Sequence, residues 1–182
     1  MPKRVLFTLF ALSLSLFLAL PAMAEDGTSL DTVAENGAAS AGVVSGLPLP
    51  RFVSLRSDTV YVRAGPGMRY PVKWVYQRRN YPLQVVQEFD TWRKIKDADG
   101  EEGWVHQSLL SGNRHVLIQS TEPLTIYKKP DDGARAVAQI EGGVVAKLNE
   151  CEDNWCEVSV SGYEGWLLKT HLWGVYEHEE SK

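Results

Sequence analysis

Two cysteines have the clearest capacity for covalent chemistry in this chain. Cys151 and Cys156 flank Glu152-Asp153-Asn154-Trp155, a segment typical of a tight hairpin turn. Two cysteines across the mouth of a hairpin predict a disulfide in an oxidising compartment. A redox role is the weaker interpretation because the Cys-x-x-Cys spacing is absent, and a zinc site is weaker still because no histidine lies close in sequence.

The other polar side chains give little support for catalysis or metal binding. A cysteine nucleophile needs a histidine base, and the Gly-x-Ser-x-Gly motif of serine hydrolases is absent. The acids between Asp97 and Glu102 are misplaced for a calcium-binding EF-hand loop and favour a solvated turn. No metal-ligand spacing relates the histidines, which are His106, His115, His171 and His178. We therefore expect no enzymatic activity, no cofactor and no metal.

Aromatic and basic side chains predict a shallow binding groove in the first half. Side chains in a strand alternate faces, so Trp155 points away from the natural core face of Cys156 and Val158, and Trp92 likewise opposes Ile95. Such a ring either packs under a loop or partner domain, which is the default in small β domains, or offers a stacking platform for peptide or sugar. The candidate groove residues are Arg63, Arg69, Tyr70, Trp74, Arg78, Arg79, Trp92 and Trp104.

Arg78 and Arg79 form a second basic and aromatic cluster with Tyr76 and Tyr81. Their guanidinium groups suit bidentate hydrogen bonds to peptide carboxylates. Contact with the acidic second half of the chain and a plain solvated loop are the alternative interpretations.

The hydrophobic pattern predicts short strands and no amphipathic helix in the mature chain. Apolar residues alternate with polar ones in segments such as 59–63, 83–89 and 92–96, and glycine, proline and aspartate end these segments. Further strands are expected at 103–106, 116–118, 124–127, 137–140, 144–148, 156–160, 165–168 and 175–176, with single 3₁₀ turns at 108–110 and 172–173. The sequence therefore predicts an all-β fold of small antiparallel barrels or sandwiches.

The chain carries the same unit twice. Trp155 follows Trp92 by 63 positions, and Gly165-Trp166-Leu167 follows Gly103-Trp104-Val105 by 62. A near-constant offset indicates a tandem duplication of a unit of about sixty residues. A unit of that size barely buries a core and rarely has room for a deep active site, which favours binding over catalysis.

The N-terminus predicts export. Lys3 and Arg4 precede an apolar run over residues 5–20, and Ala22-Met23-Ala24 gives a cleavage pattern, so we expect a signal peptide over 1–24 cut after Ala24. The alternative is an uncleaved anchor helix, although the run is short for a membrane span. The mature protein is then periplasmic or secreted, with no membrane span. Residues 25–50, which hold four acids and no lysine or arginine, predict a flexible acidic linker.

The two repeats differ in charge. Residues 51–118, the first predicted barrel, hold eleven basic and seven acidic residues, whereas residues 119–182 hold six basic and twelve acidic ones. The second predicted barrel spans 119–178 and a tail spans 179–182. Three interpretations of this charge imbalance stay open: the charges lie on solvated surface without a partner, the two halves attract each other, or the first half binds an anionic partner. Nucleic acid is excluded as a partner because the chain is acidic overall and lacks a basic helix or aromatic–basic binding motif.

These landmarks resemble the bacterial SH3-like (SH3b) domain. Its marks are a strand followed by Arg-x-Gly-Pro, a tryptophan after a hairpin turn, and a Gly-Trp-Val strand, seen here in Arg63-Ala64-Gly65-Pro66, Trp92 and Gly103-Trp104-Val105. The second copy keeps both tryptophans but has Lys128-Lys129-Pro130 at the first mark. The layout is similar to small exported tandem proteins of Gram-negative, especially alphaproteobacterial, genomes.

The resemblance implies two five- or six-stranded barrels that bind cell-wall peptide, peptidoglycan or an envelope protein. We therefore expect a non-enzymatic binding module whose partner is a peptidoglycan stem peptide or an envelope protein. The alternatives are a structural or scaffold subunit of an envelope complex without a small ligand and, more remotely, an accessory of a cell-wall hydrolase.

Overall fold

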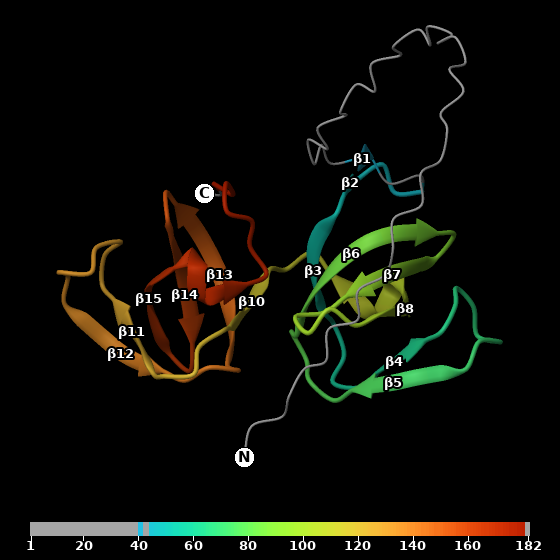
Figure 1. Ribbon diagram of the computed structural model, residues 1–182, viewed down its shortest axis with the longest axis horizontal. Helices are drawn as coiled ribbons and strands as arrows, with labels where there is room; N and C mark the ends of the chain where they lie inside the picture. Colours follow the sequence, from blue (N-terminus) through green and yellow to red (C-terminus); the bar gives the residue numbers. More distant parts are fainter. Residues whose placement is uncertain (1–39, 42–43, 181–182) are drawn as a thin grey trace, which may run out of the picture. The chain divides into compact units, whose positions relative to one another are not determined.

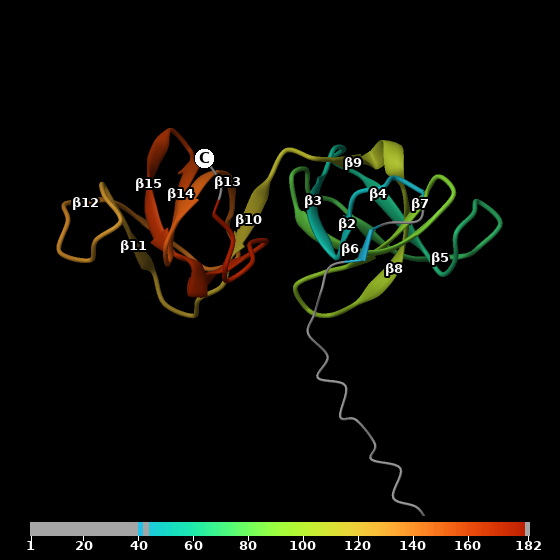
Figure 2. The same cartoon turned by 90° about the horizontal axis from the view of Figure 1, so that it is seen from above.

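The fold was described from a computed structural model of the chain, and the description covers residues 40–41 and 44–180. All of these residues belong to one compact unit that spans residues 37–182. The unit holds two seven-stranded antiparallel sheets and a two-stranded one, and its only helical elements among the described residues are two 3₁₀ turns (Figures 1 and 2). The prediction of an all-β fold with two tandem SH3-like barrels is confirmed.

The first barrel follows the strand order β5-β4-β8-β7-β6-β3-β9. The 3₁₀ turn η1 precedes β9 and sets its direction toward β3, with which β9 pairs at Leu55 and Leu110. The elements are β3 (Arg51–Leu55), β4 (Val60–Arg63), β5 (Val72–Tyr76), β6 (Pro82–Phe89), β7 (Trp92–Lys96), β8 (Glu102–His106), η1 (Gln107–Leu109) and β9 (Leu110–Ser111).

The second barrel repeats this order as β12-β11-β15-β14-β13-β10-β16. Each strand therefore has a counterpart at the same place in the first barrel, as the duplicated sequence predicts. The elements are β10 (His115–Ile118), β11 (Leu124–Tyr127), β12 (Ala136–Ile140), β13 (Val145–Glu152), β14 (Trp155–Val160), β15 (Tyr163–Leu168), η2 (Lys169–His171) and β16 (Leu172–Trp173).

The boundary between the barrels lies earlier than the predicted one after residue 118. Strand β10 pairs with β13 and β16, so residues 115–118 open the second barrel and do not close the first (Figure 2). Strand β9, the counterpart of β16, closes the first barrel by pairing with β3. Likewise, residues 175–176 form no closing strand; Val175 makes one isolated bridge to Trp173.

Each barrel has its own core of alternating strand residues. Val60, Val62 and Ile95 are fully buried in the first core, and Val116, Cys156 and Val158 in the second. The Gly-Trp motif has a packing reason, because a Cβ on Gly103 would overlap Val62 and one on Gly165 would overlap the carbonyl of Tyr127. Glycine therefore lets β8 approach β4 closely, and lets β15 approach β11 in the second copy.

Part of the predicted linker is folded onto the first barrel. Leu49 in the short strand β2 (Pro48–Leu49), which pairs with β1 (Ser40–Ala41), belongs to the first core. The backbone N–H groups of Val44 and Ser45 donate to the Glu88 carboxylate at 3.2 and 2.8 Å. The prediction of a flexible linker is thus wrong for residues 44–50, whereas residues 25–39 and the signal peptide over 1–24 lie outside the described residues. No helix within the described ranges is long and apolar enough to cross a membrane.

Candidate ligand-binding face of the first barrel

A row of side chains crosses the outward face of the first barrel. Trp104 on β8 lies opposite Arg63 on β4 and opposite Lys94 on β7. Gly103, Val105 and Ile95 point into the barrel, so alternation directs Trp104 and Lys94 outward, and both are half-buried. Tyr61, two positions before Arg63 on β4, is 54% exposed. We call Tyr61, Arg63, Lys94 and Trp104 the basic aromatic face.

Three lysines surround one carboxylate at the end of this face. Lys94 forms an ion pair with Glu102, and Lys96 lies opposite Glu102 in the strand register. Lys73 donates to the Glu102 carbonyl oxygen at 2.8 Å, with its ammonium 4.9 Å from the centroid of the Trp74 ring. The hydrogen bond from Lys94 and the charges of the lysines lower the pKa of Glu102. With three lysines around one carboxylate, the end of the face is positive.

Arg63 also holds the loop that follows β4. Its Nη1 donates to the carbonyl oxygens of Met68 at 3.2 Å and Tyr70 at 2.8 Å. The Tyr70 ring packs against Gly65, and Arg69 donates to the Tyr70 hydroxyl at 3.3 Å with its guanidinium 5.1 Å from the Tyr70 ring centroid. The structure therefore brings together Arg63, Arg69 and Tyr70 as predicted, and gives Arg63 a positioning role in this loop.

Two of the predicted groove tryptophans are packed. Trp92 is only 8% exposed and meets His106 edge-on with the ring centroids 5.5 Å apart, so packing and not an open platform is the outcome for its ring. Trp74 lies opposite the core residue Val62 and packs against the first core. Trp74 is nevertheless only half-buried, with the Lys73 ammonium beside its ring, so its role in a groove stays a prediction. The parity argument correctly kept Trp92 out of the core cluster, but His106 on the neighbouring strand covers its ring.

Arg78 and Arg79 lie apart from the basic aromatic face. Both are exposed in the turn between β5 and β6, beside the stacked rings of Tyr76 and Tyr81, whose centroids are 5.3 Å apart. No hydrogen bond or ion pair among the described residues joins either arginine to the face. The solvated-loop interpretation fits this position.

Nearby polar groups that could suggest a metal site have structural roles. Asp97 is buried and accepts hydrogen bonds from the Tyr76 hydroxyl at 2.8 Å and from the N–H groups of Asp99 and Glu101 at 3.1 and 2.9 Å. It therefore closes the turn between β7 and β8. Within the described part of the chain, no cluster of histidine, cysteine and acidic side chains has a geometry that could hold a metal ion.

The same face of the second barrel has the opposite charge. Trp166 on β15 lies opposite Tyr127 on β11 and Glu157 on β14, which occupy the places of Arg63 and Lys94. Asn149 donates to Glu157 at 3.4 Å and to Glu164 at 2.7 Å, so the acids belong to a polar network. Trp155 lies outside the second core cluster and meets Tyr127 edge-on at 5.9 Å. An anionic ligand would therefore prefer the first barrel.

Sequence reasoning missed Tyr61 and Lys94. Because Val60 and Val62 are apolar β-branched residues, alternation along β4 puts Tyr61 outward on the side of Arg63. Lys94 is outward by the same rule, since it precedes the core residue Ile95. The signal was therefore present in the residue pattern of both strands.

Comparison with known protein families agrees with the tandem fold. The family model for the bacterial SH3 domain matches residues 56–112 and 120–174, which together are more than half of the 182 residues. The chain belongs to the bacterial SH3 domain family. Domains of this family generally bind cell-wall peptidoglycan. Among curated proteins, none matches this chain.

Similar solved structures include three proteins of the NlpC type. NlpC2 and NlpC1 from Trichomonas vaginalis are 12% and 16% identical, with TM-scores of 0.34 and 0.32 over 72% and 74% of this chain. An NlpC/P60 family protein from Bacillus cereus ATCC 10987 is 11% identical, with a TM-score of 0.31 over 66% of this chain. The matches cover 51%, 48% and 55% of those chains, so this chain spans about half their length.

Proposed function

We propose that this protein is an exported, non-enzymatic module that binds cell-wall peptidoglycan through the basic aromatic face of the first barrel. The observation that carries the proposal is the placement of Trp104 between Arg63 and Lys94 on three neighbouring strands. Aromatic rings flanked by cations suit peptides that carry carboxylates, because the rings supply contact area and the cations meet the charge.

The charge difference between the barrels supports the choice of the first one. Lys94 is replaced by Glu157 at the matching place in the second barrel, and Arg63 by Tyr127. A wall peptide with free carboxylates is attracted to the first face and repelled by the second.

The absence of enzymatic activity is part of the proposal. Cys151 and Cys156 are joined in a disulfide, so neither thiol is available as a nucleophile. The disulfide also supports export, because such bonds persist in oxidising compartments. Mass spectrometry of the protein recovered from the producing cell tests cleavage of the signal peptide: a mature N-terminus at Glu25 is expected, and an intact N-terminus at Met1 contradicts cleavage.

Retention on purified sacculi tests wall binding. Lys94→Glu reverses the charge beside Trp104 and should weaken retention by about tenfold or more, the loss expected for a charge-assisted contact. Lys129→Glu makes the same change of net charge on an exposed residue of the second barrel and should leave retention unchanged. Equal retention of the two variants would refute the assignment of the face.

A protein partner is the second candidate. Strand β5 is the edge of the first sheet, and exposed apolar side chains lie on it and on its neighbour β4, namely Tyr61, Val72 and Val75. An exposed sheet edge with apolar side chains suits strand addition by a partner protein. Copurification from envelope extracts of a protein that Val75→Lys fails to capture, without sacculus retention, would favour this scaffold role.

A further inference from the structure

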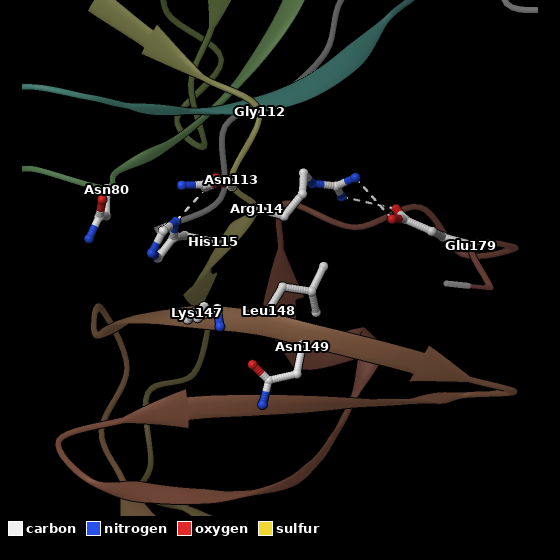
Figure 3. A pocket seen from close by; sticks show the side chains of 9 residues that line it. All are labelled: Asn80, Gly112, Asn113, Arg114, His115, Lys147, Leu148, Asn149 and Glu179. Atoms are coloured by element: carbon white, nitrogen blue, oxygen red, sulfur yellow. Dashed lines mark hydrogen bonds and ion pairs between the residues drawn. The ribbon is translucent and has the colours of Figure 1, made fainter. Parts of the chain in front are cut away.

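A polar pocket of about 650 Å³ lies beside the segment that joins the barrels (Figure 3), and no residue of the basic aromatic face lines it. Residues 112–115 form one side and β13 forms the other, with Asn80 and Glu179 at the margins. The lining residues are Asn80, Gly112, Asn113, Arg114, His115, Lys147, Leu148, Asn149 and Glu179. The lining is thus rich in amide and cationic groups, and its one acid comes from the C-terminal segment.

The pocket already holds a carboxylate of this chain. Arg114 Nη1 lies 2.9 Å from Oε1 of Glu179, and Arg114 Nη2 donates to Oε2 at 3.0 Å (Figure 3). Two parallel bonds of this kind are the usual way in which arginine recognises a carboxylate. The side chains of Arg114 and Glu179 are 26% and 15% exposed, so solvent reaches the ion pair.

The segment that delivers Glu179 is held mainly by polar contacts. Lys169 Nζ donates to the carbonyl oxygens of Glu177 at 3.3 Å and Glu179 at 2.7 Å. The Tyr176 N–H donates to Glu179 at 3.1 Å, and the Tyr176 ring lies 4.8 Å from that of Phe52. Val175 also packs against the second core, but residues 177–180 bury no apolar side chain, so this end of the segment can be displaced at modest cost.

The rest of the pocket has binding capacity that Glu179 does not use. Arg114 Nε is buried and has no hydrogen-bond partner, and the exposed Lys147 has no carboxylate within ion-pair distance among the described residues. Burial lowers the pKa of His115, and the charge of Lys147 adds to this lowering while a hydrogen bond with the Asn113 backbone opposes it. Amides of Asn80 and Asn113 complete a lining that suits peptide groups, whereas the Asn149 amide nitrogen already donates to Ser159 and Glu164.

We propose that this pocket is a carboxylate-binding site that Glu179 occupies in cis, and that a peptide with a free C-terminal carboxylate displaces it. The incoming carboxylate takes the place of Glu179 on Arg114, while Lys147 and the amides of Asn80 and Asn113 contact the peptide backbone. The choice of cell-wall peptide as the source of the ligand rests on the proposed function, but the carboxylate chemistry does not.

Titration of the mature chain with N-acetyl-D-alanyl-D-alanine tests the site, with the C-terminal amide of the same dipeptide as the matched probe. The acid should bind and the amide should not. Glu179→Gln removes the internal competitor and should tighten binding by about tenfold, whereas Glu177→Gln makes the same charge change in the same segment and should not. Lys147→Gln should weaken binding severalfold. Equal affinities of Glu179→Gln and Glu177→Gln, equal binding of acid and amide, or no binding to Glu179→Gln would each overturn the proposal.

Failure of this site and failure of wall binding give different results. Lys94→Glu should reduce sacculus retention and leave dipeptide binding intact, because Lys94 does not line the pocket. If sacculi are not retained but the dipeptide binds in the expected order of variants, the pocket stands and the proposed function fails. If sacculi are retained but the order of variants is absent, the pocket fails alone.

Discussion

The hairpin between β6 and β7 in the first barrel and the matching hairpin between β13 and β14 in the second are closed in two different ways. In the first barrel, Glu88 on β6 lies opposite Arg93 on β7 and forms an ion pair with it at 3.2 Å. In the second barrel, Cys151 on β13 lies opposite Cys156 on β14, 63 positions later in each case, and the two form a disulfide with their Cα atoms 4.1 Å apart. The turns match as well, since Asp90 and Asp153 both have left-handed φ values of 48° and 46°.

The difference shows what an ionic closure adds. The disulfide joins its two strands alone, whereas the Glu88 carboxylate also accepts hydrogen bonds from Val44, Ser45 and Arg51. The same hairpin position therefore anchors the N-terminal segment of the first barrel. A buried carboxylate is tolerated only with several partners, and Glu88, whose side chain has no exposed surface, has five donor groups.

The largest expected effect is that of Glu88→Ala. The substitution leaves Arg93, whose side chain is only 6% exposed, without its carboxylate partner, and frees the N–H groups of residues 44 and 45. Breaking one side of a buried ion pair costs about 3–5 kcal/mol, so the first barrel should unfold at much lower urea concentration. Glu150→Ala on the second barrel changes the same charge at a hairpin position without an ion pair and should cost less than about 0.5 kcal/mol. Comparable losses for both variants would remove the special role of Glu88.

Low pH should have the second-largest effect, because it weakens the Glu88 ion pair of the first barrel and not the disulfide of the second. Burial alone would raise the pKa of Glu88, but hydrogen bonds from Ser45 and Arg51 and the charge of Arg93 outweigh it and lower the pKa to about 2 from 4.5. A lowered carboxylate pKa stabilises the fold above pH 4.5, and this contribution, about 3 kcal/mol, is lost as the pH falls from 4.5 towards 2. Amide hydrogen exchange should show Val85 and Ile95 losing protection in that window before Val158 and Leu167. Simultaneous loss in both barrels would contradict the comparison.

Reduction of the disulfide should have a smaller effect, confined to the second barrel. A loop this short stabilises the folded state by about 2 kcal/mol in the chain-entropy model. Thiol titration of the exported protein under denaturing, non-reducing conditions should find no free thiol. After reduction, the urea midpoint of the second barrel should fall while that of the first remains. A stable reduced second barrel would show that its core closes the hairpin unaided.

Ser45→Ala should have the smallest effect. The Ser45 hydroxyl donates to Glu88 at 2.6 Å, but the backbone N–H groups remain to bind the carboxylate. Loss of one such hydrogen bond lowers the stability of the N-terminal segment by about 1 kcal/mol. Faster hydrogen exchange of the Leu49 amide should report this loss. Unchanged protection of Leu49 would mean that the apolar contacts of Leu49 hold the segment without the serine.

Most of the fold was predictable because alternation and duplication are local signals. Val60 and Val62 identify β4, and Cys156 and Val158 identify β14, with the inward face correct in both. The repeat offset also predicts that β10 is the counterpart of β3, because 63 positions separate Val53 from Val116 and Leu55 from Ile118. The predicted boundary nevertheless failed, since pairing of β10 with β13 and β16 is a long-range choice.

The candidate site was only partly predictable, because it depends on contacts across strands. Alternation alone gives the outward direction of Tyr61 and Lys94, but the opposition of Arg63 and Trp104 requires the register of β4 with β8. The burial of Trp92 depends on His106, and the ordering of residues 44–50 depends on Glu88, which lies more than 40 positions away in sequence. The amino-acid composition of residues 44–50 does not reveal that a distant carboxylate holds them.

Sacculus binding by Tyr61→Ala and Tyr163→Ala tests the central claim most directly. Both tyrosines are 54% exposed, one on the basic aromatic face and the other on the second barrel, so neither substitution disturbs a core. The account predicts that Tyr61→Ala weakens binding of the full mature chain to purified sacculi severalfold and that Tyr163→Ala binds as the parent does. Equal binding by both variants, or a loss only for Tyr163→Ala, would contradict the assignment of the binding face to the first barrel.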